Sequence, residues 1–459
     1  MPNWLTQDTP PNAVALEPVE ENRFSDWLEQ QDEPTRRWVA ATSFQAKAGT
    51  FCLMPSPGAE LGKVIAGITS RADPWALGDL PINLPPQDYR LEANWTVELI
   101  ERALVGWALG AYQFTHYRTD PQPRARLAIP PTCNVTAVQN PIEAIYLVRD
   151  LINTPADDMM PEQLAEAMAR LAREFGGEIK QMVGDELLTN DFPAIHAVGR
   201  ASQHPPRLID LRWGDESNPK LTLVGKGVCF DTGGLDLKSA KAMRLMKKDM
   251  GGAAHALGLG RLVMAAALPV RLRVLIAAVE NAIAGNALHP GDVIRTRQGL
   301  TVEIDNTDAE GRLILCDALA ESSREQPELV LDFATLTGAA RTALGTDIPA
   351  LFCRQDDVAS GLLRSAEREQ DPLWRLPLYA PYRALLKSTL ADLLNATDSP
   401  YAGAITAALF LGEFVPENTP WAHLDLMAFN LTGRPGRPEG GEAMGLRGIF
   451  RYLVERFAP

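Results

Sequence analysis

The second half of the chain alternates apolar runs of strand length with stretches of helical periodicity. Several of the apolar runs lack polar alternation, which is typical of a parallel sheet whose two faces are covered by helices. The strand-like runs are 208–213, 221–230, 270–280, 329–336 and 421–429. The helical stretches are 141–153, 161–176, 253–267 and 312–325. This pattern predicts an α/β fold with a mostly parallel central sheet flanked by helices.

The first part of the chain has a different pattern. It mixes short β-rich runs at 38–44, 49–56 and 63–69 with turns, and a long helix is expected at 95–114. A polar stretch marked by prolines, 118–131, has the composition of a linker. Because 459 residues exceed one ordinary core, two domains are expected. We predict a small N-terminal α/β domain with its linker at 1–132 and a larger C-terminal α/β domain at 133–459.

Composition and charge narrow the class of protein. The chain is 46% hydrophobic and 22% charged, as globular proteins are. Its net charge of -14 disfavours electrostatic capture of nucleic acid or of an anionic membrane. Neither a secretion signal nor a membrane span is expected from its apolar runs. The five cysteines are scattered and none forms a C-x-x-C pair, which favours a reducing compartment, and we expect a cytoplasmic protein.

The chemistry-bearing residues gather where the predicted strands end. Ligands of such sheets bind beyond the carboxyl ends of the strands. Lys226 and Asp231 surround one such end, Glu280 and Asn281 lie at another, and residues 335–338 follow a third. We therefore expect the site within residues 220–340.

The stretch NTDAEGRL, residues 306–313, places two carboxylates close together. Asp308 and Glu310 are separated only by Ala309. In an extended segment both side chains would point to the same side, where they would repel each other without a cation between them. The alternative is a solvated acidic turn before a helix.

Two further segments add charged groups. In VGKGVCFDTGGLDLK, residues 224–238, Lys226 closes an apolar strand, and Asp231, two glycines and Lys238 follow. Asp231 is either part of a site or the salt-bridge partner of Lys226, and neither phosphate-loop motif is matched. Asp249, in LMKKDMGGAA, precedes a predicted helix, where an ordinary acidic residue would also be favoured.

Taken together, the four carboxylates favour a metal centre. Lys226 and Lys238 would offset at most half of their charge, whereas two divalent metals would neutralise all of it. Beside two dications, the Lys226 amine would be neutral and would donate its lone pair. The histidines are dispersed and no H-E-x-x-H occurs, and His423 is interpreted as a satisfied core residue.

Arg312 is expected in the first turn of the helix that begins near Gly311. Free backbone N–H groups there make a natural seat for a small anion. The alternative is an arginine paired with a nearby carboxylate such as Asp317.

These residues resemble the leucyl aminopeptidase (cytosol aminopeptidase) family of two-metal exopeptidases. The resemblance rests on NTDAEGRL, on VGKGVCFDTGG followed by Lys238, and on MKKDMGGAA. It extends to VRDLINTPADDMMP, VGRAS, ATLTGAA, GAITAALFL and WAHLDL, and covers residues 135–450. It implies that 133–459 is a catalytic metallopeptidase domain and that the N-terminal part is the family's smaller α/β domain.

The resemblance also implies residue roles. Two divalent metal ions, Mn²⁺ or Zn²⁺ above all, would be held by Lys226, Asp231, Asp249, Asp308 and Glu310. Asp231 and Glu310 would bridge the metals, and Asp308 would add its main-chain carbonyl. Lys238 would polarise the scissile carbonyl, and Arg312 would hold a bicarbonate ion that acts as general base. The substrate would contact Met246, Thr335, Leu336, Gly338 and Met427.

The chain departs from the family pattern at a few positions. Where the family has HLDIAG, residues 423–428 read HLDLMA, so that Met427 replaces a small residue of the pocket wall. Asn430 stands where an apolar residue is common, and Thr232 replaces the usual serine of FDSGG. These changes favour a narrower or more polar pocket and leave the preference for leucine open.

The expected reaction is hydrolysis of the N-terminal peptide bond of peptides with a free N-terminus. A water or hydroxide bridging the two metals would attack the carbonyl. The resemblance further implies a homohexamer. Two rivals were weighed: a two-metal phosphoesterase, which the lysine ligand and the lack of histidine ligands disfavour, and a non-catalytic DNA-binding role, which the acidic balance disfavours.

Overall fold

The chain forms two compact units. The computed structural model describes residues 4–56, 58 and 60–458. One unit comprises Met1–Tyr146 with Thr432–Glu439, and the other comprises Leu147–Leu431 with Gly440–Pro459. The first change of unit falls inside helix α5 (Val135–Asn153), after the boundary expected at residue 132. The assignment of separate roles to the two domains remains a prediction.

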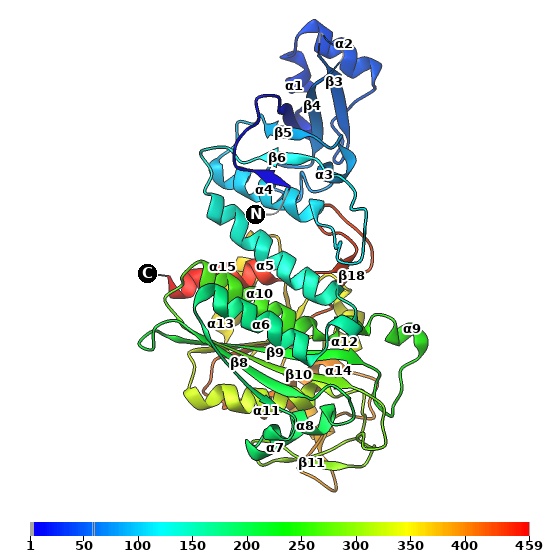
Figure 1. Ribbon diagram of the computed structural model, residues 1–459, viewed down its shortest axis with the longest axis vertical. Coiled ribbons are helices and arrows are strands. Elements are labelled where there is room, and N and C mark those ends of the chain that lie inside the picture. Colours follow the sequence, from blue (N-terminus) through cyan, green and yellow to red (C-terminus); the bar gives the residue numbers. More distant parts are fainter. Residues whose placement is uncertain (1–3, 57, 59, 459) are drawn as a thin grey trace. The chain divides into compact units, whose positions relative to one another are not determined.

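The first unit is built on a six-stranded sheet with the order β1-β6-β5-β2-β4-β3 (Figure 1). Among its described strands, only β3 and β4 pair in antiparallel fashion. The strands are β1 (Leu5–Thr6), β2 (Val14–Glu20), β3 (Phe51–Pro55), β4 (Leu61–Ile68), β5 (Asp88–Leu91) and β6 (Arg126–Ala128). The main helices are α1 (Phe24–Glu29), α2 (Glu33–Ala41), α3 (Leu80–Asn83) and α4 (Val97–Ala111). The expected strands at 49–56 and 63–69 and the expected helix at 95–114 are thus present.

Two expectations for this unit were wrong. Most of 38–44 is the end of helix α2, because Asp32 caps that helix by accepting the N–H of Thr35 and a proline stands in its first turn. Part of the expected linker 118–131 is strand β6, which pairs with both β5 and β1. Local composition could not reveal that these three residues complete a sheet.

The second unit contains an eight-stranded sheet with the order β15-β14-β17-β13-β9-β10-β8-β7. The four central strands β17, β13, β9 and β10 pair in parallel, and antiparallel pairs lie on either side of them. The strands are β7 (Glu178–Val183), β8 (Arg207–Trp213), β9 (Lys220–Asp231), β10 (Arg271–Asn281), β13 (Leu329–Ala334), β14 (Ala350–Cys353), β15 (Trp374–Arg375) and β17 (Trp421–Asp425). The predicted α/β fold with a mostly parallel central sheet is confirmed.

Helices cover both faces of this sheet (Figure 1). One face carries α6 (Pro161–Phe175), α10 (Gly251–Ala265), α13 (Asp356–Arg368) and α15 (Leu446–Phe457). The other carries α8 (Pro193–Gly199), α11 (Gly311–Ser322) and α14 (Gly403–Gly412). Burial on both sides explains why the central strands read as continuous apolar runs.

Two glycines bring α10 against the sheet at backbone distance. A Cβ on Gly225 of β9 would lie 2.6 Å from the Cα of Ala253, and a Cβ on Gly252 would lie 2.1 Å from the carbonyl oxygen of Phe333 in β13. Neither position has room for a side chain. The close approach holds the 3-10 helix η3 (Met246–Met250), which precedes α10, beside the carboxyl ends of β9 and β13.

All five cysteines, which lie within the described residues, are free thiols with buried side chains. No helix among the described residues is long and apolar enough to cross a membrane.

Candidate metal centre and substrate pocket

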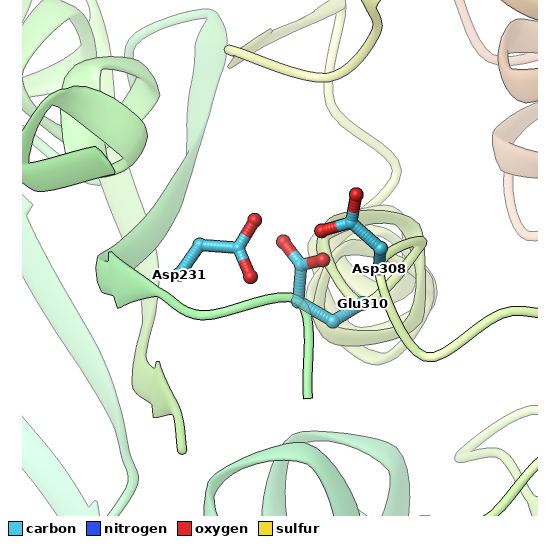
Figure 2. A group of neighbouring side chains, drawn as sticks. All are labelled: Asp231, Asp308 and Glu310. Carbon is cyan, nitrogen blue, oxygen red and sulfur yellow. The ribbon is translucent and has the colours of Figure 1, made fainter. Parts of the chain in front are cut away.

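Three carboxylates meet at the carboxyl end of strand β9. Asp231 is the last residue of β9, and Asp308 and Glu310 precede helix α11. One oxygen from each lies within 4.8 Å of the others, and Figure 2 shows the three groups facing one another. The expected convergence is therefore present, but not in an extended segment, because Asp308 lies in a turn and Glu310 is helical with φ -75° and ψ -33°.

Lys226 connects this group to Asp249. The strand does not end at Lys226 as expected but continues to Asp231, and the lysine is buried within it. Its Nζ lies 2.6 Å from Asp249 Oδ2 and 3.1 Å from Glu310 Oε1, and it donates to the carbonyl of Thr335 at 3.2 Å. A Cβ on Gly311 would lie 2.8 Å from the same Nζ, so the chain is closely packed around it.

Lys238 supplies the second cation. Its Nζ lies 2.8 Å from Asp231 Oδ2 and also donates to Asp308 Oδ1. The alternative in which Asp231 merely pairs with Lys226 is wrong, since the two lysines bind different carboxylates. Burial alone would lower the pKa values of both lysines, but the surrounding carboxylates outweigh burial and raise both pKa values well above the ordinary value.

The close approach of the buried carboxylates shifts their pKa values. Burial and the charge of Asp231 raise the pKa of Glu310 to about 8 and that of Asp308 to about 6. Burial would also raise the pKa of Asp249, but the charges of Lys226 and Lys248 outweigh it and lower that pKa. Glu310 is 2% exposed, and its Oε2 has no hydrogen-bond partner among the residues that the structure describes. A buried carboxylate oxygen without a donor leaves a position for a partner that the protein does not itself supply, such as a cation or a water.

Two polar side chains at strand ends orient the carboxylate cluster. The amide of Asn281, the last residue of β10, donates to Asp231 Oδ1 at 2.8 Å and to the carbonyl of Thr307 at 3.2 Å. Thr335 donates through Oγ1 to Asp249 Oδ1 at 2.7 Å. The only available signal for Asn281 was its place at a strand end.

Arg312 lies in the first turn of α11, as expected. Its Nη1 donates to the carbonyl of Asn395 at 2.5 Å, and its buried Nε has no partner among the described residues. The alternative partner Asp317 instead accepts the backbone N–H groups of Ala194 and Arg297, each at 2.8 Å. Burial lowers the pKa of Arg312 to about 10, so the side chain remains a cation with a free donor.

The expected substrate contacts lie around the ends of β13 and β17, which pair in parallel with Ala334 opposite Asp425. Thr335, Leu336 and Gly338 follow β13, Met427 follows β17, and Met246 opens η3. Asp425 organises the first of these segments by accepting the N–H of Leu336 at 2.9 Å and the hydroxyl of Thr337 at 2.6 Å.

Comparison with known proteins decides what this site belongs to. The sequence profile of the cytosol aminopeptidase family, catalytic domain, matches residues 146–450, and that of the M17 aminopeptidase N-terminal domain matches residues 14–130. The chain belongs to the cytosol aminopeptidase family. It is therefore a metal-dependent aminopeptidase, a metalloexopeptidase.

Solved structures and curated relatives agree. The cytosol aminopeptidase from Coxiella burnetii is 50% identical, with a TM-score of 0.96 and coverage of 99% of this chain and 100% of that one. The bottromycin maturation enzyme BotP in complex with Mn is 33% identical, with a TM-score of 0.86 and coverage of 96% and 99%. A probable cytosol aminopeptidase of Prochlorococcus marinus is 37% identical over 408 residues, which are 85% of this chain and 81% of that protein.

In this aminopeptidase, His423 is not the fully satisfied core residue that was expected. Its Nδ1 lies 2.6 Å from Asp332 Oδ1, but its buried Nε2 has no partner among the described residues. Burial alone would lower the pKa of His423, and the carboxylate of Asp332 outweighs burial and raises it. Trp421 donates to the other oxygen of the same carboxylate at 2.7 Å.

Lys248 of the aminopeptidase was also missed by sequence reasoning. It lies on η3 directly before Asp249 and is 2% exposed. Burial lowers its pKa to about 8, against the raising effect of Asp249. The charged groups that act on it also include Arg341 and Asp425, which belong to the segments around the expected substrate pocket.

Proposed function

We propose that this aminopeptidase removes the N-terminal residue of peptides with two divalent cations held by the cluster described above. The ligands would be Lys226, Asp231, Asp249, Asp308 and Glu310. The observation that carries the proposal is the buried Glu310 carboxylate, which faces Asp231 and Asp308 and has one oxygen without a donor in the described structure.

The residues present fit such cations. Four carboxylates offer oxygen donors, and Lys226 would offer a nitrogen donor once the bound cations displace its proton; such donors suit Mn²⁺ or Zn²⁺. The manganese complex of the related bottromycin enzyme supports manganese. When bound, two such cations supply an activated water and a Lewis acid for the scissile carbonyl.

Lys238 would stabilise the developing oxyanion. Its ammonium lies at the edge of the cluster, between Asp231 and Asp308, with a side chain that is 12% exposed. A fixed ammonium in such a site is a donor whose removal costs about 3 kcal/mol of transition-state stabilisation.

Arg312 would bind bicarbonate. Its guanidinium keeps a buried donor at Nε, and Nη1 is anchored on Asn395, so the orientation of the planar group is fixed. A bicarbonate oxygen accepting from this group would take the proton released when water attacks, as general base.

The substrate side chain would lie against Met246, Thr335, Leu336, Gly338 and Met427. Met427 is 7% exposed and Thr335 is 3% exposed, so most of the pocket wall is packed, while Gly338 leaves its edge open. The domain roles follow the same proposal: residues 133–459 would carry catalysis, and 1–132 would form the N-terminal domain and linker.

The proposed setting is a cytoplasmic homohexamer. Five free thiols and relatives named cytosol aminopeptidases support the compartment. Exposed apolar side chains between residues 374 and 401, among them Leu390 (70%) and Tyr401 (78%), support self-association. Sedimentation equilibrium would test the assembly, with a mass of six chains of 50.1 kDa expected and a monomer contradicting it.

The decisive experiment is hydrolysis of leucine p-nitroanilide by chelator-treated protein, before and after Mn²⁺ or Zn²⁺ is restored. Activity should vanish with the metal and return with it. Alanine, methionine and cysteinyl-glycine substrates extend the test, because Met427 narrows the pocket. Full activity at a metal content below about one ion per ten chains would contradict the proposal, and so would silence on all substrates after restoration.

A further inference from the structure

Glu442 is a buried acidic residue to which the proposed reaction assigns no part. It is 2% exposed and directly follows strand β19 (Gly440–Gly441). Arg149 of α5, which is 0% exposed, holds its carboxylate through Nη2, at 3.2 Å from each carboxylate oxygen. Burying two charges is costly even when they pair, and apolar side chains in their place often give the same stability. The pair is therefore better explained by the segments that it holds in position.

The first of these segments follows β17. Glu442 Oε2 accepts the side-chain amide of Asn430 at 2.7 Å, and the backbone N–H of Glu442 donates to the carbonyl of Ala428 at 3.0 Å. Asn430 lies in β18 (Phe429–Asn430), which pairs with β19 in antiparallel fashion. The departure from the family pattern at Asn430 thus has a buried acceptor within the fold. Met427, an expected wall of the substrate pocket, directly precedes Ala428.

A second residue of α5 holds the segment of the opposite wall. Asn153 is four residues after Arg149 and so lies on the same face of the helix. Its side-chain oxygen accepts the N–H of Gly441 at 2.8 Å, and its carbonyl accepts the Nζ of Lys247 at 2.5 Å. Lys247 follows Met246, the pocket wall expected on η3. The last turns of α5 therefore support the segments of both methionines.

The two supported segments meet at the first residue of α10. A Cβ on Gly251 would lie 2.4 Å from the Cβ of Ala428 and 3.8 Å from the Cδ1 of Ile152. Ala428 has φ +58°, and a residue other than glycine keeps such a conformation only where its surroundings hold it. A change at Ala428 would move Met427 relative to η3, which ends directly before Gly251.

We propose that Glu442, held by Arg149, is a positioning residue that keeps the Met427 wall of the substrate pocket in place. It acts through Asn430 and the carbonyl of Ala428 rather than by contact with the substrate. The inference rests on the proposed function, because it assigns the support of that same pocket. Without this support the enzyme loses contacts that the substrate makes equally in the ground state and the transition state, so KM should rise while kcat is unchanged.

Two variants test the two ends of the contact. Asn430→Leu removes the donor and leaves Glu442 paired with Arg149, whereas Glu442→Gln removes the charge and keeps the shape. In metal-loaded protein, both should raise KM for methionine p-nitroanilide at least about fivefold, with kcat within about twofold of the wild type. KM for alanine p-nitroanilide should change less than about twofold, because its side chain is too short to need the far walls of the pocket. A merely structural role would instead lower the fraction of active protein, and thus kcat at unchanged KM.

Glu321→Gln is the matched control. Glu321 lies in the last turn of α11, and its carboxylate pairs with Arg273 at 2.9 Å and with Arg297 at 2.6 Å. This variant also neutralises a glutamate held by arginine, but at the end of α11 that is remote from the cluster. It should unfold at a lower temperature than the wild type with both KM values unchanged. A rise in its KM equal to that of Asn430→Leu would overturn the inference, because any lost ion pair would then have the same effect.

The outcomes separate the two proposals. A metal-loaded wild type that hydrolyses none of the p-nitroanilides would contradict the proposed function. Titration calorimetry with free methionine would then decide the inference, since its Kd should rise at least about fivefold in Asn430→Leu and Glu442→Gln and stay constant in Glu321→Gln. Equal binding by all proteins, or no binding by the wild type, would overturn it. With an active wild type, an unchanged KM in the two test variants would leave Glu442 with a structural role alone and would overturn the inference as well.

Discussion

Glu310 concentrates the electrostatic strain of the site in one side chain. Without a cation it is buried beside Asp231, and its pKa is raised to about 8. Glu310→Gln removes this repulsion and the proposed ligand together. The metal-free variant should unfold at the same or a higher temperature than the metal-free wild type, while Mn²⁺ no longer raises that temperature and kcat/KM falls by more than about a hundredfold.

Differential scanning calorimetry with and without metal, followed by the p-nitroanilide assay, gives both results. Asp305→Asn is the control, because Asp305 is an exposed carboxylate of the same loop that lies outside the cluster. A normal metal-induced shift in Glu310→Gln would remove Glu310 from the ligand set.

Ala428 shows a different kind of residue-scale strain. It has φ +58°, in the left-handed region, at the position where the family pattern has glycine. A Cβ on Gly251 would lie 2.4 Å from the Cβ of Ala428. Gly251→Ala should therefore lower the free energy of unfolding by about 2 kcal/mol. Ala428→Gly alone should raise the free energy of unfolding by at most about 1 kcal/mol.

The double variant tests the contact directly. Ala428→Gly should recover at least about 1 kcal/mol of the loss caused by Gly251→Ala, measured as midpoints of urea unfolding. Strictly additive effects would mean that the clash is relieved elsewhere, for example at Thr335, whose Cγ2 would lie 3.1 Å from the same Cβ.

The residues of the site were more predictable than their contacts. The motifs placed Asp231, Asp308 and Glu310 together, and the structure brings them within 4.8 Å of one another. The geometry behind the expectation was different, since a turn and a helical residue bring the carboxylates together. Asn281 and Lys248 could not be found in this way, because one is an ordinary strand end and the other differs from Lys247 only by the direction of its side chain.

At the scale of elements, His255 joins α10 to the segment before α15. Its Nδ1 donates to the carbonyl of Gly251 at 2.6 Å, and its Nε2 accepts the N–H of Met444 at 2.9 Å. Acceptance by Nε2 requires the neutral imidazole, and burial lowers its pKa to about 4. The unfolded chain takes up a proton near the ordinary value of 6.5, so this stabilisation is complete above pH 6.5 and is lost as the pH falls toward 4.

His255→Leu should therefore make the free energy of unfolding depend less on pH in the acidic range. At pH 7 the variant loses its hydrogen bonds and is less stable, but the deficit should shrink by up to about 3 kcal/mol between pH 6.5 and 4. Unfolding midpoints across that range measure it, with His289→Leu, an exposed histidine, as control. A deficit that stays constant with pH would mean that His255 is protonated in the folded state.

Helices and strands were predictable where their buried faces give the sequence a regular spacing of apolar residues. The central strands and helices α6, α10 and α11 have long apolar patterns and lie where they were expected. Short elements that are defined by distant partners or by a cap were not predictable from the sequence. Strand β6 has three residues and is defined by its partners β5 and β1, and the end of α2 has a β-rich composition that the cap at Asp32 overrides.

At the scale of the whole molecule, a late segment of the chain belongs to the first unit. Residues 432–439 belong to the first unit although they follow most of the second. Gly436 and Arg437 pack on Trp75, with Arg437 stacked over the indole ring at 4.6 Å. A contact between segments so far apart in the chain has no local signature, which is why the sequence suggested a single boundary.

Because buried thiols lie in both units, their labelling rates can report the opening of each unit separately. Cys52 and Cys133 lie in the first unit, and Cys229, Cys316 and Cys353 lie in the second. Burial raises the pKa of Cys353 to about 11, and a thiol reacts with an alkylating reagent only where the chain opens. Mass spectrometry of briefly labelled protein should show adducts of two and then five labels, because the first unit has the smaller core. Added Mn²⁺ should slow the labelling of only the three cysteines of the second unit. The order in which the chain gains mass would then report which unit the metal stabilises against opening. Slower labelling of all five cysteines would mean that the units open together.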